Sequence, residues 1–430
     1  MVRGMSLSLD EIDLSDVEFW TRPWSEREAA FDLLRAEEPI RFFEEPDPVV
    51  LPQGPGYWAL TRHADVVEAS RKADLFCSGR GGSNIGDVPD EMLEFLGSII
   101  NMDDPRHAKQ RKIVSRGFTP RVLENLKHDV ERAAVEIVDE IIEKGECDFV
   151  TEVAALLPLR IILDLLGIPR SEEKFVFDRT NVILGLGDEE YVPNQDPAAV
   201  MGALFQAGQD LTSMVAELGA ERRGKDGDDI ISLLVNAQEE GDEVLTDAEL
   251  GSFFVLLVVA GNETTRNAIA HGLHWMTQHP EQKAWWWEDY DGRAPQAVEE
   301  IVRYASPVVH FRRTCTQDGT VLGGHEFAEG DKVVLWYNAA NRDPAVFDDP
   351  HRFDLSRPLE TIKDHVGFGG PGPHFCLGAH LARRQITLMY KELRERIPDI
   401  HATGEPDRLR SSFINGIKHL PASFTPGGSR

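Results

Sequence analysis

The chain has 430 residues, with 45 Lys and Arg against 74 Asp and Glu, which gives a formal net charge of −29. A chain of this length that is 41% hydrophobic and 28% charged has the composition of a globular protein that can bury a large core. The negative charge repels a phosphate backbone, so nucleic-acid binding is not expected.

No membrane anchor or secretion signal is predicted. The longest apolar runs, such as residues 253–261, are far shorter than the roughly 20 residues that a spanning helix needs. The first fifteen residues are acidic and lack the basic and then apolar order of a signal peptide. We therefore expect a cytoplasmic protein.

The first third of the chain mixes strand and helix. Residues 56–62 alternate like a strand, residues 63–73 have helical spacing, and residues 78–90 are a Gly-rich loop. From residue 105 to residue 279 nearly every window has helical period. This part is therefore predicted to be almost entirely helical.

The clearest predicted element is a long helix that begins at Thr246. Residues 246–249 have the spacing of a capping box, and the helical pattern continues to about His279, just before Pro280. A helix of this length spans about 50 Å. Its middle is almost wholly apolar, so we expect it to be buried on every side.

The last third returns to a mixed pattern. A helix is predicted from near Pro295 to the residue before Pro307, followed by strands at 320–324 and 333–337. A long loop then leads to a last helix at 377–396.

The fold class predicted from these elements is mainly α with small β-sheets. Neither an internal repeat nor a linker-like change of composition divides the chain, so residues 1–430 are expected to form one domain. Residues 1–18 are expected to be an N-terminal extension that need not be ordered.

The four cysteines are widely spaced and contain no CxxC pair, so neither a zinc site nor a disulfide framework is expected. Cys77, Cys147 and Cys315 are interpreted as buried small hydrophobic residues.

Cys376 differs because it ends a loop of glycines and prolines, residues 367–375, directly before a helix. Free amides and the helix dipole at such a position stabilise a thiolate, which can act as a nucleophile or as a metal ligand. As a nucleophile it would need an oriented base, and His374 is poorly placed for that on the same loop. As a ligand of haem iron it would favour O–O cleavage.

This loop resembles the cysteine loop of the cytochrome P-450 superfamily, the haem-thiolate monooxygenases. Cys376, Gly378 and His374 match the family pattern, and three further motifs follow the family's order over essentially the whole chain. The family's usual Phe lies seven residues before the cysteine, whereas Phe368 lies eight before it, so which side chain packs over the thiolate is left open. The resemblance implies a triangular-prism fold with the long central helix over haem b, Cys376 as the iron ligand, and O2 as co-substrate.

The second motif is residues 260–265, in the middle of the long helix. Gly261 weakens the helix by about 1 kcal/mol relative to Ala, and a buried acid is costly without a purpose. Taken alone, the segment also fits a helix kink whose polar groups bond within the core. By resemblance, Thr264 is the alcohol that hydrogen-bonds dioxygen at the haem and Glu263 is the acid that feeds its proton relay.

The third motif is the pair Glu300 and Arg303. Alone, an i, i+3 pair of this kind is an ordinary surface ion pair worth a few tenths of a kcal/mol. By resemblance it is structural, lies behind the haem and is joined by a later arginine, for which Arg342 and Arg357 are both candidates.

The fourth motif is residues 104–111. His107 and Arg111, at i and i+4, face the same side of a helix and can hold one haem propionate. Arg313 resembles the family's arginine for the other propionate, although a solvated strand arginine is the alternative.

Electrons are expected to come from another protein. The Gly-rich stretches at 78–86 and 369–372 lack the strand–GxGxxG–helix context of a dinucleotide fold. The resemblance implies a separate ferredoxin, reduced by an NAD(P)H-dependent reductase. Its predicted docking surface is basic: Arg106, Lys109, Arg111, Lys112, Arg116, Arg121, Arg383, Arg384 and Lys391.

The predicted substrate pocket has apolar walls, which implies a lipophilic substrate. Its predicted lining residues are Leu96, Ile100, Leu256, Val259, Ala260, Val308, Val309 and Phe413. Residues 180–188, 252–272, 372–384 and 413–421 resemble actinobacterial enzymes that hydroxylate a terminal methyl of methyl-branched lipids or of steroid side chains. The alternatives are a family member that hydroxylates a terpenoid or macrolide, a peroxide-driven enzyme, and a haem sensor without turnover.

Overall fold

The computed structural model describes residues 7–45, 53–88, 98–227, 229–236 and 246–427. The expected pocket residue Leu96 lies outside them. Of the expected N-terminal extension, residues 7–18 are described, and Ile12 and Leu14 are buried in the core. That part of the extension is therefore packed against the domain.

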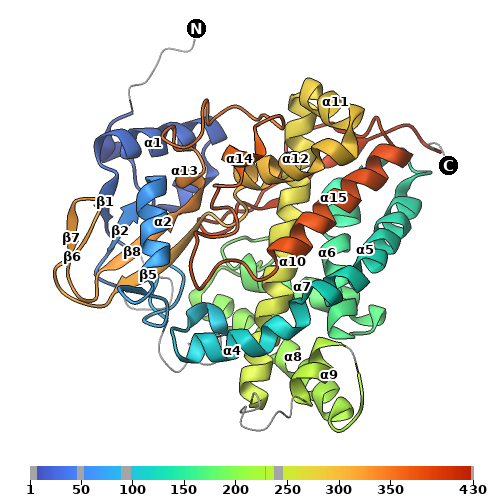
Figure 1. The fold of residues 1–430 in the computed structure, drawn as a ribbon, viewed down its shortest axis with the longest axis horizontal. Helices are drawn as coiled ribbons and strands as arrows, with labels where there is room; N and C mark the ends of the chain where they lie inside the picture. The colour runs from blue at the N-terminus through green and yellow to red at the C-terminus, as the bar shows by residue number, and fades with distance from the viewer. Residues whose placement is uncertain (1–6, 46–52, 89–97, 228, 237–245, 428–430) are drawn as a thin grey trace.

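The molecule is a single, mainly helical domain built around α10, as the sequence predicts. The long helix α10 (Asp247–Gln278) crosses the molecule, with β1, β2, β5, β8, α1 and α2 on one side (Figure 1). It packs against α6, α8, α12 and α15. The other longer helices are α1 (Trp24–Glu37), α2 (His63–Arg71), α4 (Arg106–Val114), α5 (Pro120–Ile141), α6 (Leu156–Leu166), α7 (Glu173–Leu184), α8 (Pro197–Arg222), α11 (Pro280–Glu288), α12 (Tyr290–Ala305) and α15 (Ala379–Arg396). The short ones are α9 (Ile230–Val235), α13 (Tyr337–Ala340) and α14 (Leu359–Ile362).

The main sheet has five strands in the order β1–β2–β8–β5–β3. The pair β2 and β8 is parallel and the other pairs are antiparallel. Its strands are β1 (Ile40–Phe43), β2 (Tyr57–Leu60), β3 (Phe76–Cys77), β5 (His310–Cys315) and β8 (Lys332–Trp336). Smaller sheets pair β4 (Glu146–Asp148), β12 (Pro421–Ser423) and β9 (His401–Ala402), then β10 (Asp407–Arg408) with β11 (Ile417–His419), and β6 (Thr320–Leu322) with β7 (His325–Phe327).

Local signals set the ends of α10 as expected. The Thr246 side chain accepts the N–H of Glu249, and the Glu249 carboxylate accepts the N–H of Thr246. This reciprocal pair satisfies two amides that would otherwise lack partners at the helix start. Most of the helix is buried, including Asn262, Glu263 and Asn267. The expectation that its middle is buried on every side is wrong, because Ala260 is exposed on the side that faces a cavity.

The start of α12 differs from the prediction. The helix begins at Tyr290 rather than near Pro295, because the Asp289 side chain caps it by accepting the N–H of Gly292 at 3.3 Å. Pro295 therefore lies inside the helix.

Two further sequence expectations can be compared with the structure. Cys77, Cys147 and Cys315 are buried and unpaired, which confirms their interpretation. None of the helices in the described part of the chain is long and apolar enough to cross a membrane.

Candidate functional site

A large cavity lies beneath the middle of α10 and reaches the loop that carries Cys376. Its empty volume is about 1610 Å³, counting its opening to solvent. Thr264 and Cys376 both line it, together with apolar side chains from α6 and α10. Two parts of the chain that the sequence singled out separately, more than 100 residues apart, therefore meet at one site.

The Cys376 loop is held by close backbone contacts. The N–H of Cys376 donates to the carbonyl of Phe368 at 3.0 Å. Gly369 has φ +84°, a left-handed conformation that favours glycine. A Cβ on Gly372 would lie 2.2 Å from the carbonyl oxygen of Ser70, so only glycine lets this loop pack against the end of α2.

The groups around the Cys376 thiol have opposing effects on its pKa. Burial raises its pKa, whereas a hydrogen bond from the backbone of Gly378 and the charges of Arg111 and Arg383 lower it, and the net shift is upward. The helix α15 begins only at Ala379, so the expected helix dipole does not by itself hold a thiolate. A metal ion bound to the sulfur would deprotonate it outright.

Phe368 occupies the cavity wall beside Cys376, despite the longer loop. Its ring lies 4.3 Å from the guanidinium of Arg383 and 5.7 Å from the ring of His365. These contacts hold Phe368 next to the cysteine.

A group of basic side chains lies at the cavity: Arg111, Arg313 and His374 line it, and the ring of His107 packs 4.3 Å from that of His374. Burial, followed by the charges of Arg313, His107 and Arg111, lowers the pKa of His374 to about 2. His374 is therefore neutral, and its Nε2 is 3.1 Å from the hydroxyl of Ser78.

These basic side chains fit the two carboxylates of a haem. Within the described chain, Arg111 and Arg313 form no ion pair, and the buried Nε2 of His107 has no hydrogen-bond partner. Buried cations without counter-charges are costly, so an anionic group is needed beside them. Cys376 in the same cavity supplies the sulfur that a haem iron requires.

The structure separates Thr264 from Glu263. The Thr264 hydroxyl donates to the carbonyl of Ala260 at 2.9 Å and faces the cavity. Glu263 is 1% exposed and is not among the described residues that line the cavity; its carboxylate pairs with Arg266 and accepts the side-chain N–H of Asn267 at 3.0 Å. Successive side chains point about 100° apart around a helix, and here the rotation of α10 turns Thr264 toward the cavity and Glu263 away from it. The acid role of Glu263 stays a prediction.

The structure decides which arginine joins Glu300 and Arg303. The two form a fully buried pair, with Arg303 Nε 2.7 Å from Glu300 Oε2. Arg357 Nε lies 3.2 Å from Glu300 Oε1, so Arg357 completes the network. Arg342 instead pairs with Glu28.

The predicted apolar lining is partly correct in position. Ile100 and Ala260 line the cavity, whereas Val259, Val309 and Phe413 are not among the described residues that do. Val259 lies one residue before Ala260, which faces the cavity. Val309 is buried instead in a separate core cluster that includes Trp20, Phe31 and Trp336.

Cavity residues that the sequence analysis missed follow a helical period. The face of α10 that lines the cavity includes Phe253, Leu257, Gly261, Thr265 and Ala268. Counting three and four residues in both directions from Thr264 would have found most of them. Leu256 and Val308, which the sequence analysis did predict, also line the cavity.

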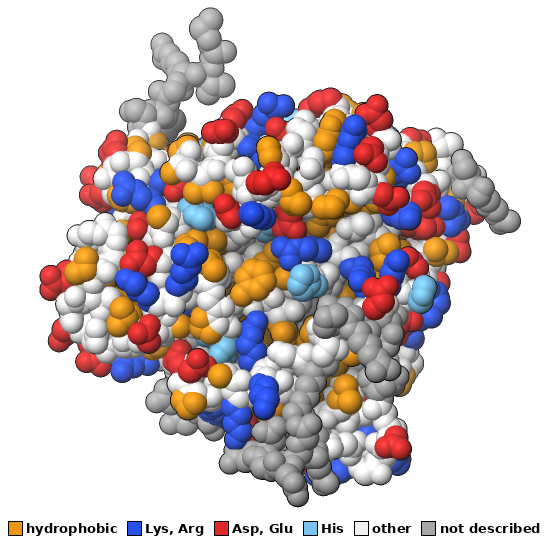
Figure 2. Space-filling view, viewed as in Figure 1, with side chains coloured by type: hydrophobic (Ala, Val, Ile, Leu, Met, Phe, Trp, Pro, Cys, Tyr) orange, Lys and Arg blue, Asp and Glu red, His pale blue; other side chains and the backbone are white. Residues whose placement is uncertain are grey.

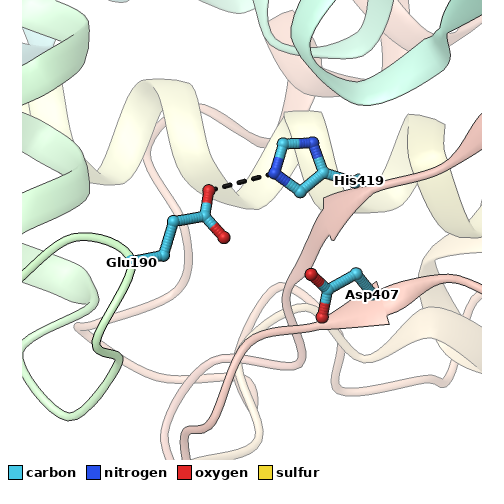
Figure 3. A group of neighbouring side chains, drawn as sticks. All are labelled: Glu190, Asp407 and His419. Atoms are coloured by element: carbon cyan, nitrogen blue, oxygen red, sulfur yellow. Dashed lines mark hydrogen bonds and ion pairs between the residues drawn. The ribbon is translucent and has the colours of Figure 1, made fainter.

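A second cluster of titratable side chains lies elsewhere. Glu190, from the loop before α8, approaches His419 on β11 and Asp407 on β10, and their ligand atoms lie within 4.8 Å of one another (Figure 3). The ammonium of Lys418 is 3.0 Å from Glu190 and 3.5 Å from Asp407, and His419 bonds both Glu190 and Asp148. The protein's own cations therefore already balance these acids.

Comparison with known proteins identifies relatives along nearly the whole chain. The family model for cytochrome P-450 matches residues 191–289 and 294–394. A methyl-branched lipid omega-hydroxylase of Mycobacterium tuberculosis is 46% identical over 418 residues, covering 96% of this chain and 95% of the relative. A steroid C26-monooxygenase of Rhodococcus jostii is 41% identical over 399 residues, covering 92% of this chain and 81% of the relative.

Solved structures agree with this result. A cytochrome P-450 of Mycobacterium marinum in complex with pseudoionone has a TM-score of 0.90 and 43% identity, covering 98% of this chain and all of that one. A Bacillus megaterium structure in complex with corticosterone has a TM-score of 0.78 and 28% identity, covering 95% of this chain and all of that one.

Proposed function

The chain belongs to the cytochrome P-450 family, and from this premise we propose that it hydroxylates the terminal methyl of a methyl-branched lipid or of a sterol side chain. It is a monooxygenase that uses haem-thiolate iron and O2. The observation that supports the substrate class is the mainly apolar wall of the cavity next to Cys376. The names of relatives 46% and 41% identical narrow the proposal to branched lipids and steroids.

The residues of the cavity have distinct tasks in this proposal. When bound, haem b supplies the activation of O2, so that one oxygen atom enters a C–H bond of the substrate. Cys376 holds its iron. Arg111, Arg313 and His107 would hold its two propionates, because the two arginines lack counter-charges there and the buried Nε2 of His107 lacks a hydrogen-bond partner.

Proton movement is assigned to α10. The Thr264 hydroxyl faces the cavity and can exchange its bond to the carbonyl of Ala260 for a bond to a group in the cavity. Glu263 supplies protons through rotation or water, since its carboxylate lies on the neighbouring face of the helix. Positioned acid–base groups of this kind commonly contribute 10²–10⁴-fold to a rate.

We propose that a ferredoxin, reduced by an NAD(P)H-dependent reductase, docks over α4 and α15. Figure 2 shows Lys and Arg side chains gathered across the middle of this face, with acidic side chains mainly toward its upper and outer edges. Phe375 is 38% exposed, and its carbonyl accepts a bond from Arg111 at 2.5 Å, so an apolar contact adjoins the basic one. An acidic carrier is attracted to such a surface.

Reduction of the haem-loaded protein by dithionite under CO tests the ligand. A red-shifted Soret band is expected, and its absence would overturn Cys376 as a thiolate ligand. Titrations with branched fatty alcohols and cholestenone should then shift the Soret band of the haem-loaded protein. No response to either would overturn only the substrate proposal, whereas a response to pseudoionone alone would favour a terpenoid substrate.

Thr264→Ala tests the proton step. We expect oxygen consumption to continue while hydroxylated product falls tenfold or more. The control is Thr387→Ala, because the Thr387 hydroxyl makes the same bond to a carbonyl four residues earlier but lies on α15 outside the cavity. Unchanged coupling in Thr264→Ala would refute the assigned role.

Charge reversal tests the docking surface. Lys109→Glu, on α4, should slow reduction by the ferredoxin at low salt and leave substrate titrations unchanged. Lys174→Glu, at an exposed lysine on α7, is the control. Equal reduction rates in both variants would remove α4 from the interface. Arg116 and Arg121, which belong to the same predicted surface, have side chains outside the described part of the structure.

A further inference from the structure

Trp24, the first residue of α1, is surrounded by guanidinium groups. The Cζ atoms of Arg342, Arg27 and Arg408 lie 4.9, 5.2 and 5.5 Å from the centroid of its ring. The ring of His271, on α10, lies 6.2 Å away. Three positive charges thus meet at one indole, where α1, the C-terminal half of α10 and β10 come together.

The charges in this group do not balance. Arg342 pairs with Glu28, and Glu28 is shared with His351. Arg27, which is 8% exposed, and Arg408 form no ion pair with any residue in the described ranges. Two arginines are therefore left close together without a carboxylate of their own.

Hydrogen-bond donors are unsatisfied at the same place. Buried nitrogens without a partner in the described chain include Trp24 Nε1, Arg27 Nε and Nη2, and Arg408 Nη1. A buried donor left unpaired costs about 1–3 kcal/mol, and more when it is charged. Several such donors in one group indicate that an acceptor with several lone pairs binds there.

The backbone at the start of α1 adds to the positive electrostatic potential around Trp24. Arg27 lies in the first turn of α1, where free amides carry the positive end of the helix dipole, and Pro23 at the cap provides no side-chain acceptor. Burial and then the charge of Arg408 lower the pKa of Arg27 to about 10. Burial and then Arg408 also lower the pKa of His274, to about 4. These shifts agree with a close group of like charges.

We propose that Arg27 and Arg408, with Trp24 Nε1, bind a small free oxyanion at a site separate from the haem cavity. A planar guanidinium matches phosphate or carboxylate oxygens with two parallel bonds. None of the three residues lines the cavity. Because the side chains are mostly buried, a free ion fits better than the end of a large molecule. Bound there, the anion would join α1 and β10.

Thermal unfolding of the haem-loaded protein tests the site with inorganic phosphate as the probe. Phosphate well above its dissociation constant should raise Tm by a few degrees more than sodium chloride at equal ionic strength. A response no larger than that to chloride would overturn the proposal. An equal response to glycerol 2-phosphate would overturn the preference for a free ion, and a weaker response would support it.

Arg408→Met should abolish the extra response to phosphate. In chloride the variant should be as stable as the parent or more so, because a like charge has been removed, and in phosphate it should be less stable. Arg410→Met is the matched control, since Arg410 is an exposed arginine paired with Glu18 and should keep the response. A full response in Arg408→Met would overturn the proposal.

A direct measurement covers the case in which the variant does not fold. Crystals of the parent protein soaked in selenate should give an anomalous peak within hydrogen-bond distance of Arg27 and Arg408. Selenate peaks only elsewhere on the molecule would overturn the assignment.

Discussion

Two buried arginine groups near the cavity differ in one respect, their charge balance. Arg303 is fully bonded: Glu300 holds it from one side, and the carbonyls of Asn341 and Pro350 accept from it at 2.7 and 2.9 Å. Arg111 and Arg313 instead face the cavity and ion-pair with no carboxylate in the described chain. A balanced group stabilises the fold by itself, whereas an unbalanced one is complete only when a ligand brings the missing charge.

The group around Trp24 belongs with the second kind, although it lies outside the cavity. The cluster of Lys418 and His419 belongs with the first, since acidic side chains surround both cations. Charge balance, rather than burial, therefore separates structural groups from binding groups in this molecule.

Breaking the balanced network should have the largest effect. Glu300→Gln leaves Arg303 and Arg357 buried without a counter-charge, so we expect a loss of about 3–5 kcal/mol in the free energy of unfolding. Urea unfolding of the haem-loaded protein measures it. Glu288→Gln, in an exposed pair with Arg293, should change the stability by less than about 0.5 kcal/mol. A loss below about 1 kcal/mol for Glu300→Gln would contradict the structural role.

A second balanced group, Glu299 with His365 and Arg383, makes the free energy of unfolding depend on pH. Burial alone would raise the pKa of Glu299, but hydrogen bonds from His365 and Arg383 lower it to about 2, below its ordinary value of 4.5. The stabilisation is therefore complete above about pH 4.5 and is lost as pH falls toward 2, by about 3 kcal/mol in total and about 1 kcal/mol by pH 4.

Unfolding free energies at pH 7 and pH 4 measure this contribution. The parent should lose about 1 kcal/mol more between the two pH values than Glu299→Gln does. The difference between the proteins isolates one carboxylate from all the others. Identical losses would show that the pKa of Glu299 is not lowered.

The unbalanced group should respond in the opposite way. Arg313→Gln should weaken haem retention about tenfold, or about 1.4 kcal/mol. The free energy of unfolding of the haem-free chain should stay the same or rise slightly, because an unpaired charge has been removed. Transfer of haem to a competing apoprotein measures retention. The neighbouring Arg312 pairs with Asp87 at 2.7 Å, so Arg312→Gln should destabilise the chain itself. Equal haem retention and equal stability of the two variants would contradict the distinction between an arginine that binds haem and an arginine that stabilises the fold.

The smallest expected effect is at the surface. Hydrogen bonds to Asp32 and Glu28 raise the pKa of His351 to about 9, from an ordinary value of 6.5. Its stabilisation is therefore complete below about pH 6.5 and is lost as pH rises toward 9. His351 is 37% exposed, so screening by solvent limits the contribution to about 1 kcal/mol or less. Unfolding at pH 6 and pH 9.5 should differ more in the parent than in His351→Gln.

The sequence by itself determined the elements whose signals are local. The capping box at Thr246, the Gly- and Pro-rich loop before Cys376 and the i, i+3 spacing of Glu300 and Arg303 each depend on neighbouring residues, and all three lie where they were expected. Such features depend on spacing within a few residues, which the sequence states directly.

Only the tertiary structure decided which distant groups meet and which way side chains face. The sequence left Arg342 and Arg357 as equal candidates for the third member of the Glu300 network. In the folded chain Arg357 pairs with Glu300, and Arg342 pairs with Glu28. The rotation of α10 turned Thr264 toward the cavity and Glu263 away from it. The group around Trp24 joins residues nearly 400 positions apart, from α1 to β10. The physical reason is that the rotation of a helix and the meeting of remote segments are set by the burial of the whole core, which no local spacing records.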